Sequence, residues 1–355
     1  MDFTDKAAAI RNGESLDRKR VEIFLKDAIP GLSGELDIRQ FPGGYSNLTY
    51  LLTIGNRELV LRRPPFGTKA RSAHDMSREF RVLTALHPVF PYCPKPLAYS
   101  EDPALIGCPF YVMERLRGII LRKDLPGGLA LTPLQAEKLC DRFLDVLVEL
   151  HRVDYRAVGL ESFGKPDGYI HRQVTGWSDR YRAARTEDAP DFEAVMAWIK
   201  EKKPVDTQRP SIIHNDYRLD NIVLDSFNPE TIIGVLDWEM AAVGDPLMDL
   251  GNTLAYWVER DDPDERKEIR MMPTHLPGFP TRAELIRCYR EKSGRSFEDF
   301  DFYYCFGMFR LAVIAQQIYY RYFHGQTQDK RFKLLIFVVH ILERAARRVV
   351  ETSKL

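Results

Sequence analysis

The periodicity of apolar residues changes once along this chain of 355 residues, and that change limits the possible folds more than any other feature. Residues 36–63 alternate apolar and polar side chains and are interrupted at Pro42-Gly43-Gly44 and Gly55-Asn56, a pattern typical of antiparallel strands joined by turns. After residue 118 the apolar spacing is mostly helical. The sequence therefore predicts an α+β fold with a small β-rich lobe and a larger, mostly helical lobe.

The same periodicity of apolar residues predicts the individual helices and strands. Helical spacing predicts helices at 15–29, 71–87, 133–151, 281–293, 299–323 and 330–350. Alternating or continuous apolar runs predict a strand within 109–118 and a short β segment within 211–237. We therefore expect an N-terminal lobe over 1–112, a connector over 113–118 and a C-terminal lobe over 119–355.

Composition excludes several classes of protein. The 51 basic residues balance the 51 acidic ones, so no field of one sign indicates binding to nucleic acid or to an anionic membrane. No apolar run approaches the about 20 residues that span a bilayer, and the N-terminus has no apolar signal segment. The five scattered cysteines lack zinc-ligand spacing. We expect a soluble, cytoplasmic protein with reduced thiols, and the sequence does not predict its oligomeric state.

The densest set of chemically useful residues lies between 214 and 237. Phosphoryl transfer needs one carboxylate that accepts the proton of an attacking hydroxyl, and hard oxygen ligands that hold Mg²⁺ against the phosphates. Asp216 can supply the carboxylate, and Asn221 and Asp237 can supply the metal ligands. Each alone is a common turn former, but their order, with an apolar run at 232–236 leading into Asp237, indicates a catalytic loop and a metal site.

This arrangement resembles a known family. His-x-Asp-x4-Asn followed by an apolar strand and an Asp resembles the catalytic core of protein kinases, and Asp237-Trp238-Glu239 resembles the aminoglycoside and choline phosphotransferase branch. Within that branch, GGYSNLTY, LVLRRPP and DWEMAAVGDPLMDLG are similar to bacterial phosphotransferases akin to the kinase-like domain fused to acyl-CoA dehydrogenase. The resemblance implies a two-lobed protein-kinase-like fold, ATP and Mg²⁺ as cofactors, and a structural role for His214 in orienting the loop.

In the first lobe, the resemblance implies a nucleotide site. Glycines let the backbone approach phosphates closely, so we expect a phosphate-covering loop made of Gly43, Gly44, Ser46 and Asn47. A simple hairpin turn is the alternative.

Kinases carry a lysine on the third strand, whereas the corresponding run here is Leu59-Val60-Leu61-Arg62. Arg62 is therefore the expected phosphate ligand, although a guanidinium differs from an ammonium in bulk and geometry. Glu79 is its expected partner on the following helix, with an exposed glutamate as the alternative. Backbone groups of Glu114 and Leu116, in the connector, are expected to meet the adenine edge.

The acceptor is less defined by the sequence. Asp249 is expected to brace the catalytic loop, and the many aromatic residues after 250 fit core packing. No acidic run suited to a polycationic antibiotic is present, whereas basic residues are available for an anionic acceptor at Arg180, Arg182, Arg185 and Arg310. By analogy with the dehydrogenase-fused relatives, a hydroxyacyl-CoA is a candidate acceptor.

Three functions remain open at this point. The complete set of Asp216, Asn221 and Asp237 favours an ATP-dependent phosphotransferase that acts on the alcohol group of a small molecule. Arg62 motivates the alternative of a catalytically degenerate nucleotide-binding module. The same carboxylates are also compatible with a metal-dependent hydrolase that releases phosphate without an acceptor.

Overall fold

The computed structural model describes residues 2–42, 47–65 and 75–355, which form two compact units. Unit 1 comprises Met1–Ile120 and Asn221–Ala241, and unit 2 comprises Leu121–Asp220 and Ala242–Leu355. The segment 221–241 therefore packs with the N-terminal part of the chain, an association that the hydrophobic pattern does not indicate.

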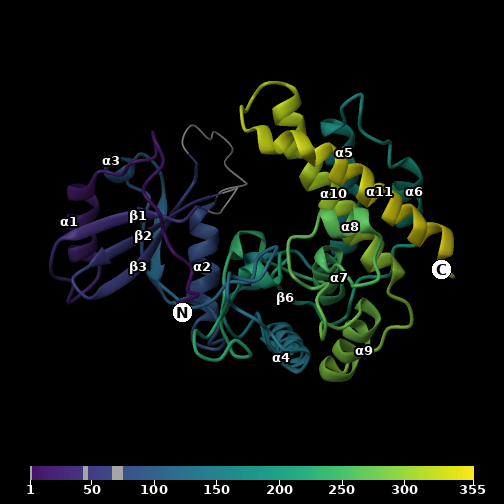
Figure 1. Cartoon of the computed structure of the whole chain (residues 1–355), viewed down its shortest axis with the longest axis horizontal. Coiled ribbons are helices and arrows are strands. Elements are labelled where there is room, and N and C mark those ends of the chain that lie inside the picture. Colours follow the sequence, from purple (N-terminus) through teal and green to yellow (C-terminus); the bar gives the residue numbers. More distant parts are fainter. Residues whose placement is uncertain (1, 43–46, 66–74) are drawn as a thin grey trace. The chain divides into compact units, whose positions relative to one another are not determined.

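Unit 1 is built on a five-stranded antiparallel sheet with the order β1-β2-β3-β5-β4 (Figure 1). Its strands are β1 (Leu36–Gln40), β2 (Leu48–Ile54), β3 (Arg57–Arg63), β4 (Pro96–Ser100) and β5 (Phe110–Glu114). The antiparallel pairing of β1 with β2 and of β2 with β3 confirms the three strands predicted over 36–63. Gly55 turns the chain between β2 and β3 with φ +60°, and a Cβ there would lie 2.6 Å from the Ser33 carbonyl oxygen, so a side chain does not fit.

Alternation along β3 sends its side chains to two different surroundings. Leu59 and Leu61 belong to a buried cluster that includes Val21 and Leu25 of α1 (Arg18–Ala28). Arg62 has the opposite direction, and it meets α2 (Met76–Leu86), which packs against β4 and β5. The strand period of two thus separates an apolar core from a polar site. The short helix α3 (Pro103–Ile106) completes this part of the unit.

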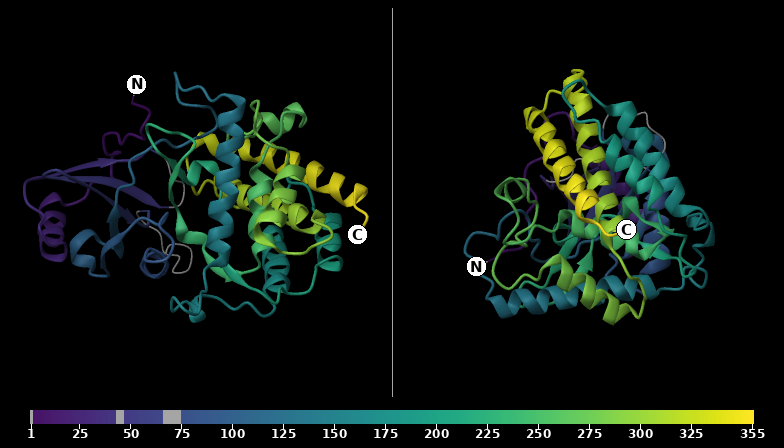
Figure 2. Two further views of the ribbon diagram at one scale, coloured as in Figure 1. Left: turned by 90° about the horizontal axis from the view of Figure 1, so that it is seen from below. Right: turned by 90° about the vertical axis from the view of Figure 1, so that its right-hand side faces the viewer.

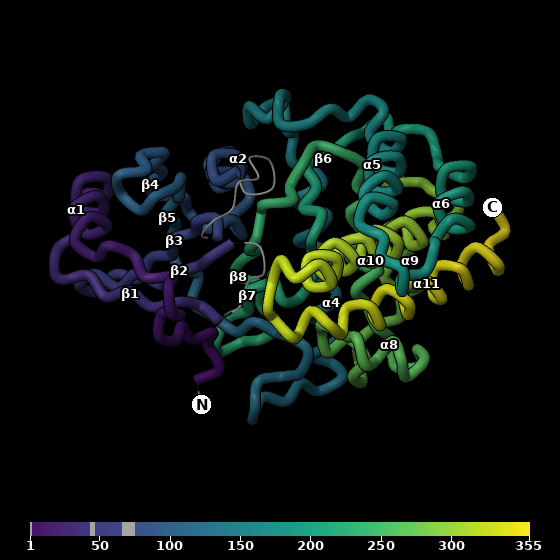
Figure 3. The backbone as a smooth tube through the Cα atoms, turned by 90° about the horizontal axis from the view of Figure 1, so that it is seen from above, coloured from purple at the N-terminus to yellow at the C-terminus, as the bar shows by residue number. Residues whose placement is uncertain are grey.

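The remainder of unit 1 is a hairpin of β7 (Ile222–Leu224) and β8 (Ile232–Val235), drawn side by side in Figure 3. Ile222 pairs with Val235, and the Leu236 N–H donates to the Asn221 carbonyl at 2.8 Å. The two ends of the hairpin therefore lie together. The 3-10 turn η3 (Trp238–Met240) follows, and Trp238 is buried with its ring edge-on to Phe90.

Unit 2 is mostly helical, and α10 is its central helix. Helix α10 contacts α5, α7 and α11, and Figure 2 shows α10 and α11 running side by side. The helices are α4 (Pro133–Arg152), α5 (Tyr169–Ala184), α6 (Glu193–Glu201), α7 (Pro246–Tyr256), α8 (Asp264–Glu268), α9 (Arg282–Ser293), α10 (Asp301–Phe323) and α11 (Leu335–Thr352), with 3-10 turns η1 (Glu161–Phe163), η2 (Leu219–Asn221) and η4 (Lys330–Leu334). The predicted helices at 133–151, 281–293 and 299–323 are confirmed, whereas the one at 330–350 begins as η4.

Helices α7 and α10 approach so closely that their contact requires glycine. A Cβ on Gly307 would lie 2.3 Å from the Gly251 carbonyl oxygen, and a Cβ on Gly251 would lie 2.3 Å from the Tyr303 carbonyl oxygen. Strand β6 (Ser211–Ile213) pairs with β9 (Ala242–Gly244) and also contacts α7. It leads into the loop that contains His214 and Asp216. This packing fixes the start of that loop against α7.

None of the helices in the described ranges combines the length and the apolar character that crossing a membrane requires.

Candidate active site

A buried cluster of charged side chains in unit 1 centres on Arg62. Its side chain is 8% exposed, and Nη1 donates to Glu79 Oε1 at 2.8 Å while Nη2 donates to Asp237 Oδ1, also at 2.8 Å. Glu239 Oε2 lies 3.7 Å from Nη2. The pairing of Arg62 with Glu79 that the sequence predicts is present, and Asp237 joins it from a distant part of the chain.

Burial and charge act in opposite directions in this cluster. Burial disfavours the Arg62 guanidinium, but Asp237 and Glu79 raise its pKa well above the ordinary value. Burial raises the pKa of Glu79, and the Arg62 charge offsets only part of that rise. Among the described residues, Glu79 Oε2 and Arg62 Nε have no hydrogen-bond partner. One cation therefore faces three carboxylates, and the cluster has unused hydrogen-bonding capacity.

The predicted metal ligands Asn221 and Asp237 lie at the same end of the β7–β8 hairpin, because the contact between Leu236 and Asn221 closes it. Asp237 has φ +66°, the left-handed region that side chains rarely occupy, and its side chain remains 31% exposed. An amide oxygen and a carboxylate suit Mg²⁺, which typically takes one or two protein oxygens together with substrate phosphates and water. The donor set therefore fits magnesium.

The remaining residues predicted to bind the nucleotide belong to the phosphate loop and to the connector. Gly43, Gly44 and Ser46 lie outside the described residues, whereas Asn47 is buried and its Nδ2 donates to Glu239 Oε2 at 2.6 Å. Glu114 ends β5, where its N–H donates to the Lys95 carbonyl at 2.9 Å and its Oε1 accepts from the Lys95 N–H at 2.8 Å. Leu116 packs over Gly234 of β8, where a Cβ would lie 2.1 Å from Leu116 Cδ1.

In unit 2, Asp249 of α7 holds the predicted catalytic loop by its backbone. Oδ2 accepts from the His214 N–H and Oδ1 from the Asn215 N–H, both at 2.7 Å. His214 is fully buried, and its Nδ1 accepts from the Asp216 N–H at 3.3 Å. The expected bracing role of Asp249 and the structural role of His214 are thus confirmed. Asn215 has φ +64°, so the backbone bends sharply just before Asp216.

Sequence reasoning missed His151 of α4, which completes this brace. Its Nε2 lies 3.1 Å from Asp249 Oδ2, and its Nδ1 lies 2.8 Å from the Tyr289 hydroxyl. Burial lowers the pKa of His151, so a neutral ring donates to Asp249. Burial opposes the charge of Asp249, but hydrogen bonds from His151 and His214 hold its pKa below the ordinary value. A lone histidine on an amphipathic helix gives no sequence signal of this partnership.

Asp216 itself is contacted by a neighbouring arginine. Arg218 Nε donates to Asp216 Oδ2 at 3.2 Å, and its Nη1 lies 3.1 Å from Asp220 Oδ2. The Asp216 side chain is 17% exposed. Burial raises the pKa of Asp220 to about 6, and Asp216 adds to this rise. Arg218 therefore contacts two carboxylates, and part of the Asp216 side chain remains exposed.

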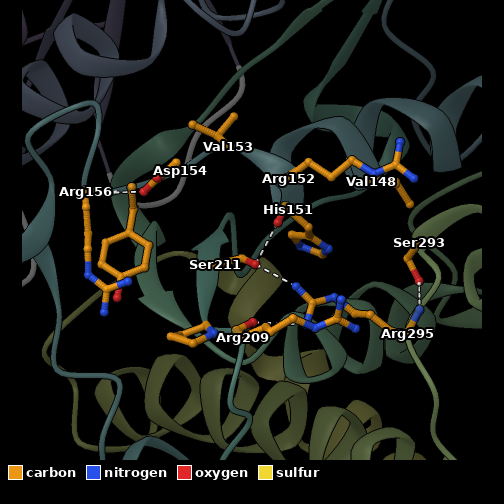
Figure 4. A pocket seen from close by; sticks show the side chains of 12 residues that line it. Val148, His151, Arg152, Val153, Asp154, Arg156, Arg209, Ser211, Ser293 and Arg295 are labelled. Carbon is orange, nitrogen blue, oxygen red and sulfur yellow. Dashed lines mark hydrogen bonds between the residues drawn. The ribbon is translucent and has the colours of Figure 1, made fainter.

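Unit 2 also contains a pocket of about 500 Å³, and His151 is among its lining residues (Figure 4). Arg295 donates to the Ser211 hydroxyl at 2.9 Å and to the Arg209 carbonyl at 3.0 Å, and the Ser211 hydroxyl donates to the His151 carbonyl at 2.7 Å. None of the predicted site residues lines this pocket. The predicted site is thus divided, with Asp216 in unit 2 and with Asn47, Arg62, Glu79, Asn221 and Asp237 in unit 1.

Comparison with known sequences identifies a family and several relatives of this chain. The model of the phosphotransferase enzyme family (APH) matches residues 37–285. Acyl-CoA dehydrogenase family member 10 of Mus musculus is 38% identical over 326 residues, which cover 90% of this chain and 30% of that protein. Acyl-CoA dehydrogenase family member 11 of Homo sapiens is 33% identical over 336 residues, covering 92% and 42%. The chain spans less than half the length of these relatives.

Solved structures are also similar. A candidate aminoglycoside phosphotransferase from Ralstonia eutropha JMP134 superposes with a TM-score of 0.80 at 29% identity, covering 96% of this chain and 100% of that one. Choline kinase from Cryptosporidium parvum Iowa II gives a TM-score of 0.62 at 12% identity, covering 94% and 97%. The second likeness concerns the fold alone. The predicted α+β, protein-kinase-like fold is confirmed.

Proposed function

Because the chain belongs to the phosphotransferase enzyme family, we propose that it is a kinase that transfers the γ-phosphoryl group of ATP to the hydroxyl group of a small molecule. The observation that carries this proposal is the hydrogen bond from the Leu236 N–H to the Asn221 carbonyl, which closes the β7–β8 hairpin beside Asp237, together with the ion pair of Asp237 with Arg62. Residues far apart in the sequence thus form the oxygen and guanidinium groups that a metal–triphosphate requires.

In this proposal, Asn221 and Asp237 hold Mg²⁺, which when bound neutralises charge that develops on the phosphates. Arg62 contacts phosphate oxygens while Glu79 keeps its guanidinium oriented from α2. Since Arg62 currently donates to Asp237, nucleotide binding requires the guanidinium to share its donors between the carboxylate and the phosphates. The predicted phosphate loop and the backbone of Glu114 and Leu116 would complete the nucleotide site.

Asp216 is the proposed base. The acceptor hydroxyl oxygen forms a bond to the γ-phosphorus, the bond to the β-phosphate oxygen breaks and leaves ADP, and the hydroxyl proton passes to the Asp216 carboxylate. Arg218 orients that carboxylate, because its guanidinium lies 3.2 Å away. Asp249 holds the loop through the amides of His214 and Asn215. The position of Asp216 is therefore set before the acceptor binds.

A hydroxyacyl-CoA-like metabolite is the acceptor class that we propose. The support is the identity of 38% to a protein named as an acyl-CoA dehydrogenase family member, across 90% of this chain. A phosphotransferase unit in such a protein would act on a hydroxylated form of a compound related to those of its partner domain. This step rests on analogy.

The metal site can be tested with Asp237→Ala. Purified wild-type protein should gain thermal stability from Mg²⁺ with ATP, because a ligand that binds only the folded state stabilises it. Asp237→Ala should lose this gain, whereas Asp225→Ala, the same substitution at the opposite end of the same hairpin, should keep it. If wild-type protein shows neither nucleotide binding nor turnover of any hydroxylated metabolite, the proposed function is wrong.

A specific observation also favours a second candidate, a catalytically degenerate nucleotide-binding module. Both terminal nitrogens of Arg62 are bonded to carboxylates, as in a structural ion pair. Under this alternative Arg62→Lys should raise a very low phosphotransfer rate. High activity in the wild type, with ATP consumption strictly dependent on an acceptor, would exclude both this module and a hydrolase.

A further inference from the structure

Arg310 of α10 is a buried cation in unit 2 that the proposed mechanism does not use. Only 4% of the residue is exposed, and its guanidinium carbon lies 5.1 Å from the centre of the Trp177 ring on α5. Within the described part of the chain, Arg310 forms no ion pair with a carboxylate and no hydrogen bond. A buried charge of this kind is costly unless something compensates it.

The Trp177 ring offers only partial compensation, because it also faces a second cation. The guanidinium carbon of Arg180, three residues later on α5, lies 4.6 Å from the same ring centre. Partial burial lowers the pKa of Arg180, and the Arg310 charge lowers it further, so the two guanidinium groups repel each other. Arg180 is exposed, which opens this cluster to solvent. Two like charges around one aromatic ring favour an anion between them.

Tyr256 of α7 connects this cluster with the predicted catalytic loop. Arg218, which contacts Asp216, is stacked on the Tyr256 ring with its guanidinium carbon 4.8 Å from the ring centre. Burial and the Asp216 charge raise the pKa of Tyr256, whereas the Arg218 and Arg310 charges lower it. Tyr256 lies on α7, which packs against α10, the helix that carries Arg310. An acceptor that reaches Asp216 can therefore extend toward Arg310.

We propose that Arg180, Trp177 and Arg310 form an anion subsite that holds the negatively charged end of the acceptor while its hydroxyl group faces Asp216. This proposal rests on the proposed function, which it deepens by assigning the residues that hold the negative charge of the acceptor. The flat indole supports an apolar stem, and the two guanidinium groups bind a carboxylate or phosphate oxygen. A polycationic acceptor would be repelled here.

Two sources can supply this negative charge: the carboxylate of a free hydroxy acid, or the phosphates of a coenzyme A thioester. Paired acceptors distinguish them. For the carboxylate, phosphorylation of 3-hydroxybutyrate is compared with that of neutral 1,3-butanediol. For the phosphates, 3-hydroxybutyryl-CoA is compared with the neutral N-acetylcysteamine thioester of the same acid. In at least one pair, the anionic member should have a kcat/KM at least about tenfold higher.

The variants are Arg310→Gln, Arg180→Gln and, as a matched control, Arg182→Gln. Arg182 lies on the same helix, but its charge is already paired with Glu193 at 2.8 Å. The first two variants should lower kcat/KM for the anionic acceptor roughly 10- to 100-fold, mainly through KM, and leave the neutral acceptor unchanged. Arg182→Gln should behave as the wild type. Because Arg180 is exposed, its variant tests the subsite even if Arg310→Gln fails to fold.

A binding experiment separates this inference from the proposed function. Titration calorimetry with 3-hydroxybutyrate and with coenzyme A, in saturating Mg²⁺ and ADP, measures the subsite without any turnover, while thermal stabilisation by Mg²⁺ and ADP reports the nucleotide site. Binding of either probe that is lost in Arg310→Gln and Arg180→Gln but kept in Arg182→Gln supports the subsite even where turnover is absent. If neither probe binds the wild type at millimolar concentration, or if all variants bind alike, the subsite is wrong.

Discussion

The buried carboxylate of Glu79 in unit 1 faces a guanidinium, whereas that of Asp249 in unit 2 faces backbone amides and a neutral imidazole. Both side chains are essentially inaccessible, at 1% and 0% exposed. Asp249 accepts three hydrogen bonds of 2.7–3.1 Å on its two oxygens. Glu79 uses Oε1 alone, for Arg62 and for the Trp238 N–H at 3.2 Å, and its Oε2 has no hydrogen-bond partner among the described residues.

Their pKa values differ accordingly. Burial raises the pKa of Glu79 despite its arginine partner, whereas the hydrogen bonds around Asp249 outweigh burial and lower its pKa. Directed hydrogen bonds therefore stabilise a buried charge more completely than one ion pair does in this protein. Asp249 has the character of a permanent brace. The cluster around Arg62 retains donors and acceptors that a ligand can use.

The largest effect is expected from Arg62→Met, which removes the cation that pairs with Glu79 and Asp237. It leaves Glu79 and Asp237 without their partner, and breaking a buried ion pair in this way costs about 4 kcal/mol of unfolding free energy. Urea denaturation followed by circular dichroism measures the loss. The double variant Arg62→Met with Glu79→Gln should recover about half of it, because no uncompensated glutamate remains. Equal losses in the two variants would show that packing, and not charge, determines the stability of the cluster.

Asp249→Asn should destabilise the protein by about 3 kcal/mol at neutral pH, since the amide places N–H groups against donors that the carboxylate accepts. The matched control is Asp245→Asn, the same chemical change at the N-cap of α7. Asp245 caps α7 by accepting from the Leu247 N–H at 2.8 Å, and asparagine caps helices as well as aspartate does. Urea denaturation of the two variants side by side measures the difference. A similar loss in both would contradict the bracing role of Asp249.

Asp245→Asn itself should stabilise the protein as the pH rises. Burial raises the pKa of Asp245 from 3.8 to about 6, so the folded state holds a proton that the unfolded state releases. Wild-type stability should therefore decline, relative to the variant, between about pH 4 and about pH 6. At pH 7 the variant should be more stable by about 3 kcal/mol. Denaturation at a series of pH values tests this, and a constant difference across the series would show that Asp245 does not titrate in this window.

The sequence predicts what local patterns encode. Alternation over 36–63 gives the three strands, and the direction of Arg62 on β3 together with the following helix gives its pairing with Glu79. The loop from His214 to Asn221 and its brace by Asp249 follow from the motif and its family resemblance. These features depend on spacing within one or two neighbouring elements.

Contacts between distant segments could not be predicted in the same way. The bond between Arg62 and Asp237 depends on the β7–β8 hairpin packing with the N-terminal sheet. The partnership of His151 with Asp249 depends on how α4 packs near α7, and a histidine on an amphipathic helix is compatible with many surroundings. Burial of Arg310 is equally invisible, because an arginine in a helix is usually exposed. In each case tertiary packing, and not local pattern, determines the partner.

The smallest effect is expected from Arg182→Gln, which isolates burial as a variable. The ion pair of Arg182 with Glu193 has the same distance of 2.8 Å as that of Arg62 with Glu79, but its side chains are 51% and 53% exposed instead of 8% and 1%. Water already solvates both groups, so removing the cation should cost about 0.5 kcal/mol or less, and salt should abolish even that. Urea denaturation at low and high ionic strength measures it. A loss close to that of Arg62→Met would mean that the geometry of the pair, and not its burial, determines its contribution, and the contrast between the Arg62 cluster and the surface of unit 2 would no longer hold.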